Sequence, residues 1–348
     1  MKMMWLITIL SICIAFTSAF QFVEYEDDTS NPKFKFDMNF GDGNETFTKM
    51  TTRFHLDENN IDGTWFATYW TPGKEARIQP KNINALIFVV HGYSEYLSNN
   101  YDEIAKHWSQ QVGGGALVFG HDHAGHGRTT FGKRALATDM KDFTAPIIAH
   151  VREIQKLTKR NDKNLPVFVA AQAFGGLISL ATILEEPKLF QGLIGIGPLV
   201  KLNPEATPKI MVFLAELISK FWPSFGLIAG IDVKDVTRDE SHWNSMETDP
   251  LIYHGRIQAG TVWFLMKETK YLQEHLEKIE LPILVLQGEN DPLLDPEGAK
   301  MLYVRASSKD KEYKEYPGAF HLLLIELPKV REDVKKRSTE WLNNRCEA

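Results

Sequence analysis

The sequence has few cysteines, no surplus of positive charge and only one long apolar run. Two cysteines among 348 residues cannot make a disulfide framework or a cysteine-ligated metal site. Lys and Arg number 39 against 45 Asp and Glu, a net charge of −6 at pH 7. This charge balance argues against a nucleic-acid partner, because no basic surplus exists to neutralise phosphates. The hydrophobic share of 43% and the charged share of 24% exclude a disordered, collagen-like or coiled-coil protein.

The apolar run lies at the N-terminus. Lys2 precedes apolar residues 3–16, and Thr17-Ser18-Ala19 places small residues before a cut after Ala19. The run is shorter than the roughly 20 apolar residues that a membrane span needs. We predict a signal peptide over residues 1–19 and a secreted or lumenal chain over 20–348. An uncleaved signal anchor is the alternative.

Short apolar segments alternate with amphipathic ones from about residue 50 onward. Predicted strands lie at residues 64–70, 85–90, 116–119, 167–170, 193–196 and 283–287. Predicted helices lie at residues 101–112, 143–159, 176–184 and 327–343. Several of these strands are apolar at both odd and even positions, as strands buried on both faces must be. The alternation predicts an α/β fold with a mostly parallel central sheet flanked by helices. Residues 21–50 either add an edge strand or drape over the domain.

Residues 201–265 break this alternation. They contain no convincing strand but many large apolar residues, with an aromatic cluster at Phe221, Trp222 and Phe225. We predict a helical cap inserted over the carboxyl edge of the sheet. The cluster carries more aromatic bulk than one buried face needs, which favours contact with a lipid or membrane surface. Packing of these side chains onto the core alone is the alternative.

Polar and glycine-rich segments follow the predicted strands. They lie at residues 90–95, 120–127, 169–176, 287–292 and 318–321. Ligands of open α/β sheets bind outside the carboxyl ends of the strands, so these segments are expected to converge on one crevice.

The segment at 169–176 has the spacing of the nucleophile elbow G-x-S-x-G. This turn is tight and strained, so the residues two before and two after the nucleophile must have almost no side chain. Ala171 and Gly175 meet that need, but Ala173 occupies the nucleophile position. The order elbow, Asp291, His321 is that of α/β-hydrolases.

From about residue 50 to 345, the chain resembles monoacylglycerol lipases of the α/β-hydrolase fold. The pieces that carry the resemblance occur in family order at residues 91–92, 120–127, 166–176, 197–200, 249–252, 286–291 and 318–328. The resemblance implies a serine hydrolase that cleaves monoacylglycerols or similar lipid esters without a cofactor.

The resemblance also assigns roles to individual residues. Asp291 is the acid that orients the base His321, and the backbone N–H groups of Tyr93 and Phe174 form the oxyanion hole. The departure is Ala173, which has no oxygen and can form no acyl-enzyme. We therefore expect a chain that binds the lipid ester and is severely impaired in hydrolysing it.

Two explanations of Ala173 stay open. The chain is either a natural lipid-binding pseudoenzyme or an active lipase inactivated by replacement of its serine. Changes at neighbouring elbow positions favour the first, whereas the retained Asp291 and His321 favour the second. Ser94, beside the oxyanion loop, is a weak candidate for a relocated nucleophile because it lacks an elbow.

His121, Asp122, His123 and His126 lie close enough in sequence to suggest a metal site. Zinc ligands must converge in space with ordered partners around them. The same block is a structural loop in the family that the chain resembles, so we predict no metal here.

The N-terminal segment generates a first prediction. Mature protein recovered from the medium of expressing cells should begin near Phe20 or Gln21, because the cut is predicted after Ala19. Mass spectrometry of the intact protein measures this end. A chain that stays in the cell and starts at Met1 would contradict the signal peptide.

Overall fold

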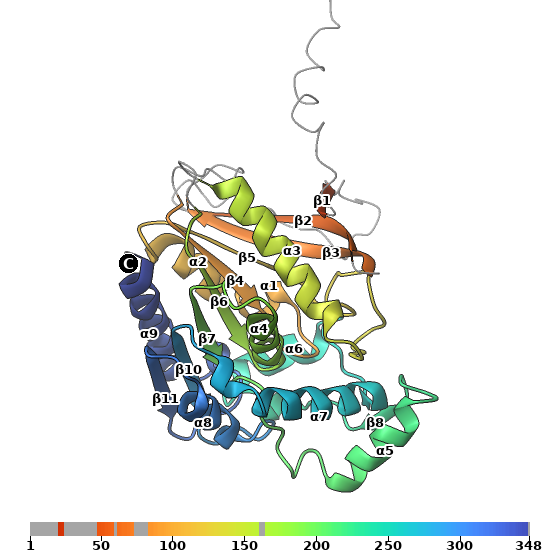
Figure 1. Cartoon of the computed structure of the whole chain (residues 1–348). Coiled ribbons are helices and arrows are strands. Elements are labelled where there is room, and N and C mark those ends of the chain that lie inside the picture. The colour runs from red at the N-terminus through yellow and green to blue at the C-terminus, as the bar shows by residue number, and fades with distance from the viewer. Residues whose placement is uncertain (1–19, 24–46, 59–60, 73–82, 160–163, 347–348) are drawn as a thin grey trace, which may run out of the picture.

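The computed structural model describes residues 20–23, 47–58, 61–72, 83–159 and 164–346 (Figure 1). The predicted signal peptide, residues 1–19, lies outside the described residues.

A mixed sheet forms the centre of the described chain. Its nine described strands lie in the order β1-β2-β3-β5-β4-β6-β7-β10-β11, with antiparallel pairing from β1 to β5 and parallel pairing from β5 to β11. The strands are β1 (Phe20–Val23), β2 (Phe47–Glu58), β3 (Ile61–Pro72), β4 (Ala85–Val90), β5 (Ala116–His121), β6 (Val167–Gln172), β7 (Gly192–Ile196), β10 (Ile283–Gly288) and β11 (Lys311–Tyr316). The predicted α/β fold with a mostly parallel sheet is therefore confirmed.

All six predicted strands lie within observed ones. β2 and β11 were not predicted at all, whereas β1 matches one of the two alternatives given for residues 21–50, an added edge strand. The sequence of β11 is Lys-Glu-Tyr-Lys-Glu-Tyr. Charged side chains are typical of an edge strand, where they discourage pairing with another chain. β1 pairs with β2, so the N-terminal part of the predicted mature chain adds an edge strand.

Helices cover both faces of the sheet. One face packs against α3 (Lys141–Thr158), α4 (Phe174–Glu185), α7 (Ala259–Gln273) and α8 (Pro296–Arg305). The other packs against α2 (Asp102–Gln111) and α9 (Pro328–Cys346). In β4 the side chains of Leu86, Phe88 and Val90 face the first layer, and those of Ala85, Ile87 and Val89 face the second. This two-sided burial explains why the central strands are continuous apolar runs.

The segment between β7 and β10 forms the cap, which extends to one side in Figure 1. It contains α5 (Lys209–Ser219), α6 (Trp243–Thr248), the 3-10 turns η3 (Val233–Asp235) and η4 (Glu240–His242), and α7, followed by η5 (Leu276–Lys278). The expectation of helices alone was wrong, because β8 (Gly226–Ile228) and β9 (Ile257–Gln258) form a small antiparallel sheet. The predicted end at residue 265 falls inside α7. The remaining elements are α1 (Leu97–Asn100) and η6 (Leu323–Ile325).

The helix α5 carries apolar side chains on two faces. Met211, Leu214 and Ile218 pack against a small core shared with α7, β8 and β9. Ile210 and Phe213 point away from that core and are 60% and 53% exposed. Packing onto the core therefore explains only one of the two faces. No described helix is both long and apolar enough to cross a membrane.

Buried histidines cluster between β3, β5 and α3. Tyr69 Oη lies 2.8 Å from His150 Nε2, and the Nδ1 atoms of His150 and His121 lie 3.1 Å apart. His91 and His123 are joined by two hydrogen bonds of 2.9 Å. Within the described part of the chain, no group of three or more potential ligands is arranged to hold a metal ion. These histidines instead hydrogen-bond to one another and to the chain around them.

This cluster predicts a loss of stability in acid. Burial lowers the pKa of His123 and His150 to about 3 and that of His126 to about 4. The unfolded chain therefore takes up protons on these rings as the pH falls below about 6.5, where the folded chain does not. Asp122 opposes this loss, since burial raises the pKa of its carboxyl to about 6, and the raised pKa values of Glu95, Asp142 and His321 act in the same direction. The five buried histidines with lowered pKa values, His91, His121, His123, His126 and His150, outnumber these groups. The free energy of unfolding should fall between about pH 6.5 and 4.

Urea unfolding at a series of pH values measures this dependence. His150→Gln should weaken the pH dependence, because glutamine takes up no proton, whereas the same change at exposed His254 should leave it unaltered. Equal stability at pH 7 and pH 4.5 would contradict the prediction.

Candidate functional site

Ala173 forms the sharp turn between β6 and α4. Its φ of 51° and ψ of −118° are rare for a residue with a side chain, and such strain persists only where the surroundings hold it. Its N–H donates to the carbonyl of Ile196 at 3.1 Å. Its own carbonyl accepts from the N–H groups of Gly176 and Leu199, each at 2.9 Å. The chain thus builds the backbone of a nucleophile elbow around a methyl group.

Gly175 allows the elbow to lie against the end of β4. A Cβ at this position would lie 2.2 Å from the carbonyl oxygen of Val90 and 2.6 Å from that of His91. Both contacts are with backbone atoms that cannot move aside. The end of β4 is therefore the reason that the residue at position 175 must be a glycine.

Asp291 and His321 are paired in the loops that follow β10 and β11. Asp291 Oδ2 lies 2.6 Å from His321 Nδ1, and both residues are 5% exposed. Asp291 Oδ1 accepts from the N–H groups of Leu293 at 2.9 Å and Leu294 at 3.0 Å. Because a carboxylate only accepts, Nδ1 donates and Nε2 is left to exchange a proton.

The pairing sets the charge state of both groups. Burial alone would raise the pKa of Asp291, but the charge and hydrogen bond of His321 hold it below its usual range. Burial alone would lower the pKa of His321, but Asp291 raises it above its usual range. Each partner therefore favours the ionised form of the other.

Ala173 and His321 share a small cavity beneath the cap. Its volume is about 50 Å³. The cap contributes an apolar wall that includes Val233, Val236 and Met246. The site is therefore closed by residues about 60 positions away from the elbow in sequence, which the motifs alone did not indicate.

The loop after β4 forms another wall of this cavity. A Cβ on Gly92 would lie 3.4 Å from Ala173 Cβ, so the loop passes directly beside the elbow. Tyr93 follows, and its backbone N–H is one of the two predicted oxyanion donors. The other belongs to Phe174, the first residue of α4, where an N–H has no acceptor within its helix. Ser94 also lines the cavity and has a φ of 69°.

Glu95 orders this loop, a role that the sequence did not reveal. Its Oε1 accepts from the Gly92 N–H at 2.6 Å and from Tyr101 Oη at 2.8 Å, and its Oε2 accepts from Asn100 Nδ2 at 2.7 Å. Burial raises the pKa of the Glu95 carboxyl. The sequence feature that could have indicated this role is an acidic residue three positions after Gly92, in the loop that follows a buried strand.

Comparisons with known proteins match this geometry. The family model described as serine aminopeptidase, S33 (Hydrolase_4) matches residues 81–328, which include the elbow, Asp291 and His321. Human monoglyceride lipase is 35% identical over 287 residues, covering 82% of this chain and 89% of the relative.

Two solved structures have the same fold. A monoacylglycerol lipase from Paleococcus ferrophilus gives a TM-score of 0.65 at 25% identity, over 75% of this chain and 94% of that one. A soluble variant of monoglyceride lipase from Saccharomyces cerevisiae gives 0.71 at 24% identity, over 83% and 94%. With its elbow turn, its Asp291–His321 pair and its sheet order, the chain belongs to the monoglyceride lipase family of α/β-hydrolases.

Proposed function

We propose that this chain binds a monoacylglycerol or a similar lipid ester beneath the cap and is severely impaired in hydrolysing it. The observation that carries the proposal is Ala173, an elbow residue with a methyl group beside a paired base and acid. A serine hydrolase needs a hydroxyl oxygen there to form its acyl-enzyme. Without that oxygen, the two-step displacement has no first step.

The other groups of the site suit an ester. The N–H groups of Tyr93 and Phe174 would bind the carbonyl oxygen, and the apolar wall from the cap would hold the acyl chain. A cavity of about 50 Å³ is far smaller than the roughly 300–1,000 Å³ of ordinary ligand pockets. Binding an acyl chain therefore requires the cap wall to move outward.

The retained Asp291–His321 pair supports slow hydrolysis as a second candidate. His321 Nε2 could take a proton from a water held where a serine oxygen would lie, and that water would attack the ester directly. Binding and oxyanion donors alone leave about 10³–10⁴-fold catalysis over water in enzymes that have lost their triad. The measured rate of ester hydrolysis therefore distinguishes a binding protein from a slow esterase.

Restoring the oxygen tests the proposal. Ala173→Ser should raise hydrolysis of a monoacylglycerol by several orders of magnitude, because loss of a triad serine costs about 10⁶ in turnover. The backbone already holds the elbow conformation, so the change adds one atom at a prepared position. Glycerol release measures the rate.

A further Asp291→Asn or His321→Ala change should abolish this gain. If Ala173→Ser folds, binds lipid and stays as slow as the parent, the pair is not assembled for catalysis.

A fluorophosphonate probe should label the introduced hydroxyl of the Ala173→Ser variant and leave the parent unlabelled. Labelling of Ser94 in the parent would contradict the impaired assignment.

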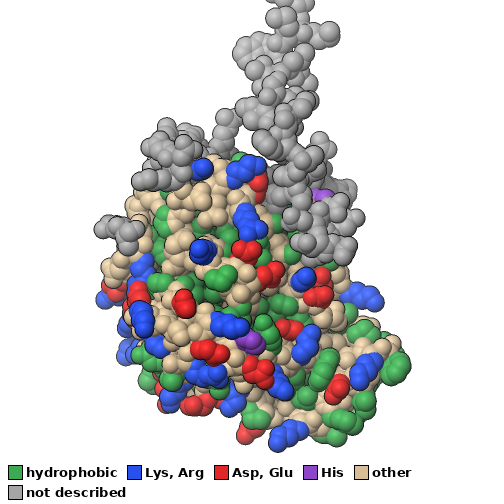
Figure 2. Space-filling view, viewed as in Figure 1, with side chains coloured by type: hydrophobic (Ala, Val, Ile, Leu, Met, Phe, Trp, Pro, Cys, Tyr) green, Lys and Arg blue, Asp and Glu red, His purple; other side chains and the backbone are tan. Residues whose placement is uncertain are grey.

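We also propose that the cap contacts a lipid surface. Large exposed apolar side chains gather on α5 and the turn after it, and green patches lie among tan and charged side chains on the projecting lobe in Figure 2. Phe221 is 90% exposed and Trp222 is 60% exposed, and Trp222 packs against Phe225. Because the cap also walls the cavity, this surface would deliver a lipid ester next to the site.

Removing the aromatic side chains tests this contact. The triple change Phe221→Ser, Trp222→Ser and Phe225→Ser should weaken binding to phosphatidylcholine vesicles about tenfold or more, since each buried aromatic contributes roughly 1.5–3 kcal/mol. Vesicle sedimentation measures binding. Val304→Ser, an exposed apolar position on α8, is the matched control and should bind as the parent does. A lowered melting temperature with unchanged vesicle binding would show that the aromatics are core residues.

Finally, we propose that the chain acts outside the cytoplasm. The N-terminal segment supports this proposal, and recovery of the processed chain from the medium tests it.

A further inference from the structure

The loop that carries His321 contains little regular structure. It runs from the end of β11 to the start of α9, with only the short turn η6 inside it. The sheet side holds its beginning, since the N–H of Asn290 donates to the carbonyl of Ala319 at 3.0 Å and the N–H of Gly318 donates to Glu289 Oε2 at 2.8 Å. The position of His321 also depends on whatever holds the rest of the loop.

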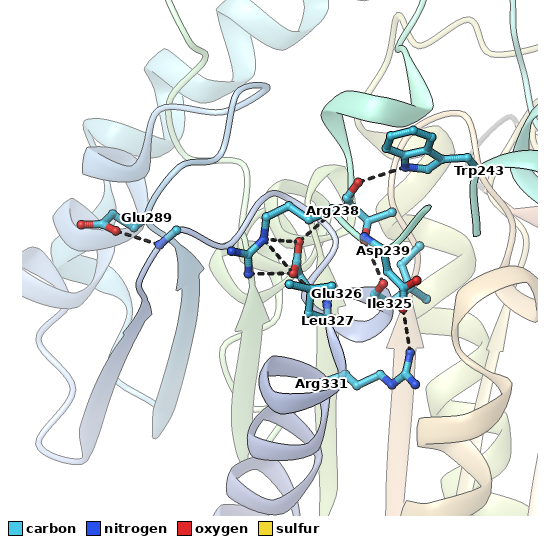
Figure 3. A network of polar contacts seen from close by, with 10 residues as sticks. Arg238, Asp239, Trp243, Glu289, Ile325, Glu326, Leu327 and Arg331 are labelled. Carbon is cyan, nitrogen blue, oxygen red and sulfur yellow. Dashed lines mark hydrogen bonds and ion pairs between the residues drawn. The ribbon is translucent and has the colours of Figure 1, made fainter. Parts of the chain in front are cut away.

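The cap holds that remaining part through residues 236–238, which lie between η3 and η4. The N–H of Leu322, the residue after His321, donates to the carbonyl of Val236 at 2.8 Å. Thr237 Oγ1 donates to the carbonyl of Ile325 at 2.9 Å. Figure 3 shows this segment lying against the loop.

Arg238 and Glu326 make the strongest of these connections (Figure 3). The Glu326 carboxylate is fully buried and accepts from Arg238 Nε at 3.0 Å, Arg238 Nη2 at 2.8 Å and the Arg238 N–H at 2.9 Å. The N–H of Leu327 donates to it at 2.8 Å. Burial would raise the pKa of Glu326, but the bonds from Arg238 hold it below its usual range. A bidentate fork of this kind fixes direction as well as distance.

The same guanidinium lies beside the beginning of the loop. Arg238 Nη1 lies 3.2 Å from the position that a Cβ would take on Gly318, whose φ is 67°. Arg238 therefore lies beside the loop three residues before His321 and is hydrogen-bonded to it five residues after. It does not line the cavity that holds Ala173 and His321.

We propose that Arg238 is a positioning residue for His321, acting through Glu326 to fix the His321 loop against the cap. The His321–Asp291 contact then depends on the cap segment staying in place. A cap that moves outward to admit a lipid must either carry this loop along or keep residues 236–238 fixed while the lipid-facing part moves. The inference rests on the proposed function only in taking His321 as the base.

NMR titration of the His321 ring in the chain as it exists tests the proposal without any catalysis. Arg238→Lys keeps the charge but loses the fork. Because loss of one partner leaves a buried charge alone, the double variant Arg238→Met with Glu326→Leu provides a second test in which no charge is left unpaired. Both variants should lower the pKa of His321 and remove its Nδ1–H signal, since Asp291 raises that pKa against the effect of burial. Glu95 is the other charged group facing the ring and stays in place.

Activity in the Ala173→Ser background provides a second readout. The turnover number should fall by about tenfold to 10²-fold with KM little changed, because the base is misplaced while the lipid wall remains. Arg331→Met is the matched control, since Arg331 pairs with Asp239 at 3.3 Å in the same network without touching Glu326. It should leave both measurements as they are.

A folded Arg238→Lys or double variant with the parent pKa and Nδ1–H signal at His321 would overturn the proposal. This outcome is distinct from failure of the proposed function, in which Ala173→Ser stays inactive while the His321 signals still respond to Arg238.

Discussion

The close contact between the elbow and the end of β4 governs the geometry of the site. Gly175 lies so near the carbonyl oxygens of Val90 and His91 that no side chain fits there. This contact holds the start of α4 beside the loop at Gly92. The Ala173 methyl, the predicted oxyanion donors and the opening of the cavity consequently share one small region. A larger residue at position 175 would separate these groups before any question of chemistry arose.

This constraint explains how the site can keep its shape with an alanine at position 173. The strained φ of Ala173 is held by hydrogen bonds from its own backbone, none of which involves a side-chain oxygen. Asp291 and His321 are likewise held by each other and by backbone N–H groups. Removing one member of a buried charged pair typically costs about 3–5 kcal/mol, because its partner is left uncompensated. Stability alone therefore favours retention of the Asp291–His321 pair, whichever residue occupies position 173.

The cap has two physically different sides. Its inner side closes the cavity with apolar residues and braces the His321 loop through Arg238 and Glu326. Its outer side exposes aromatic residues such as Phe221 that no described part of the chain covers. If the outer side contacts a lipid surface as proposed, the same element would link the arrival of substrate to the position of His321. The proposed surface contact and the proposed positioning role thus concern the same segment of chain.

Local rules in the sequence were enough to predict the buried strands, the elbow, and the order of Ala173, Asp291 and His321. The strands follow from local apolar patterns, and the elbow was predicted from its spacing. The reason that Gly175 must lack a side chain, the backbone of Val90 and His91, became visible only in the folded chain. The strands β2 and β11 were not predicted, because neither has the continuous apolar run that marks the central strands, and β11 lies at the edge of the sheet. Glu95 and the Arg238–Glu326 pair were also missed. Arg238 and Glu326 lie 88 residues apart, and only the folded chain, by burying a carboxylate that must then be paired, brings them together.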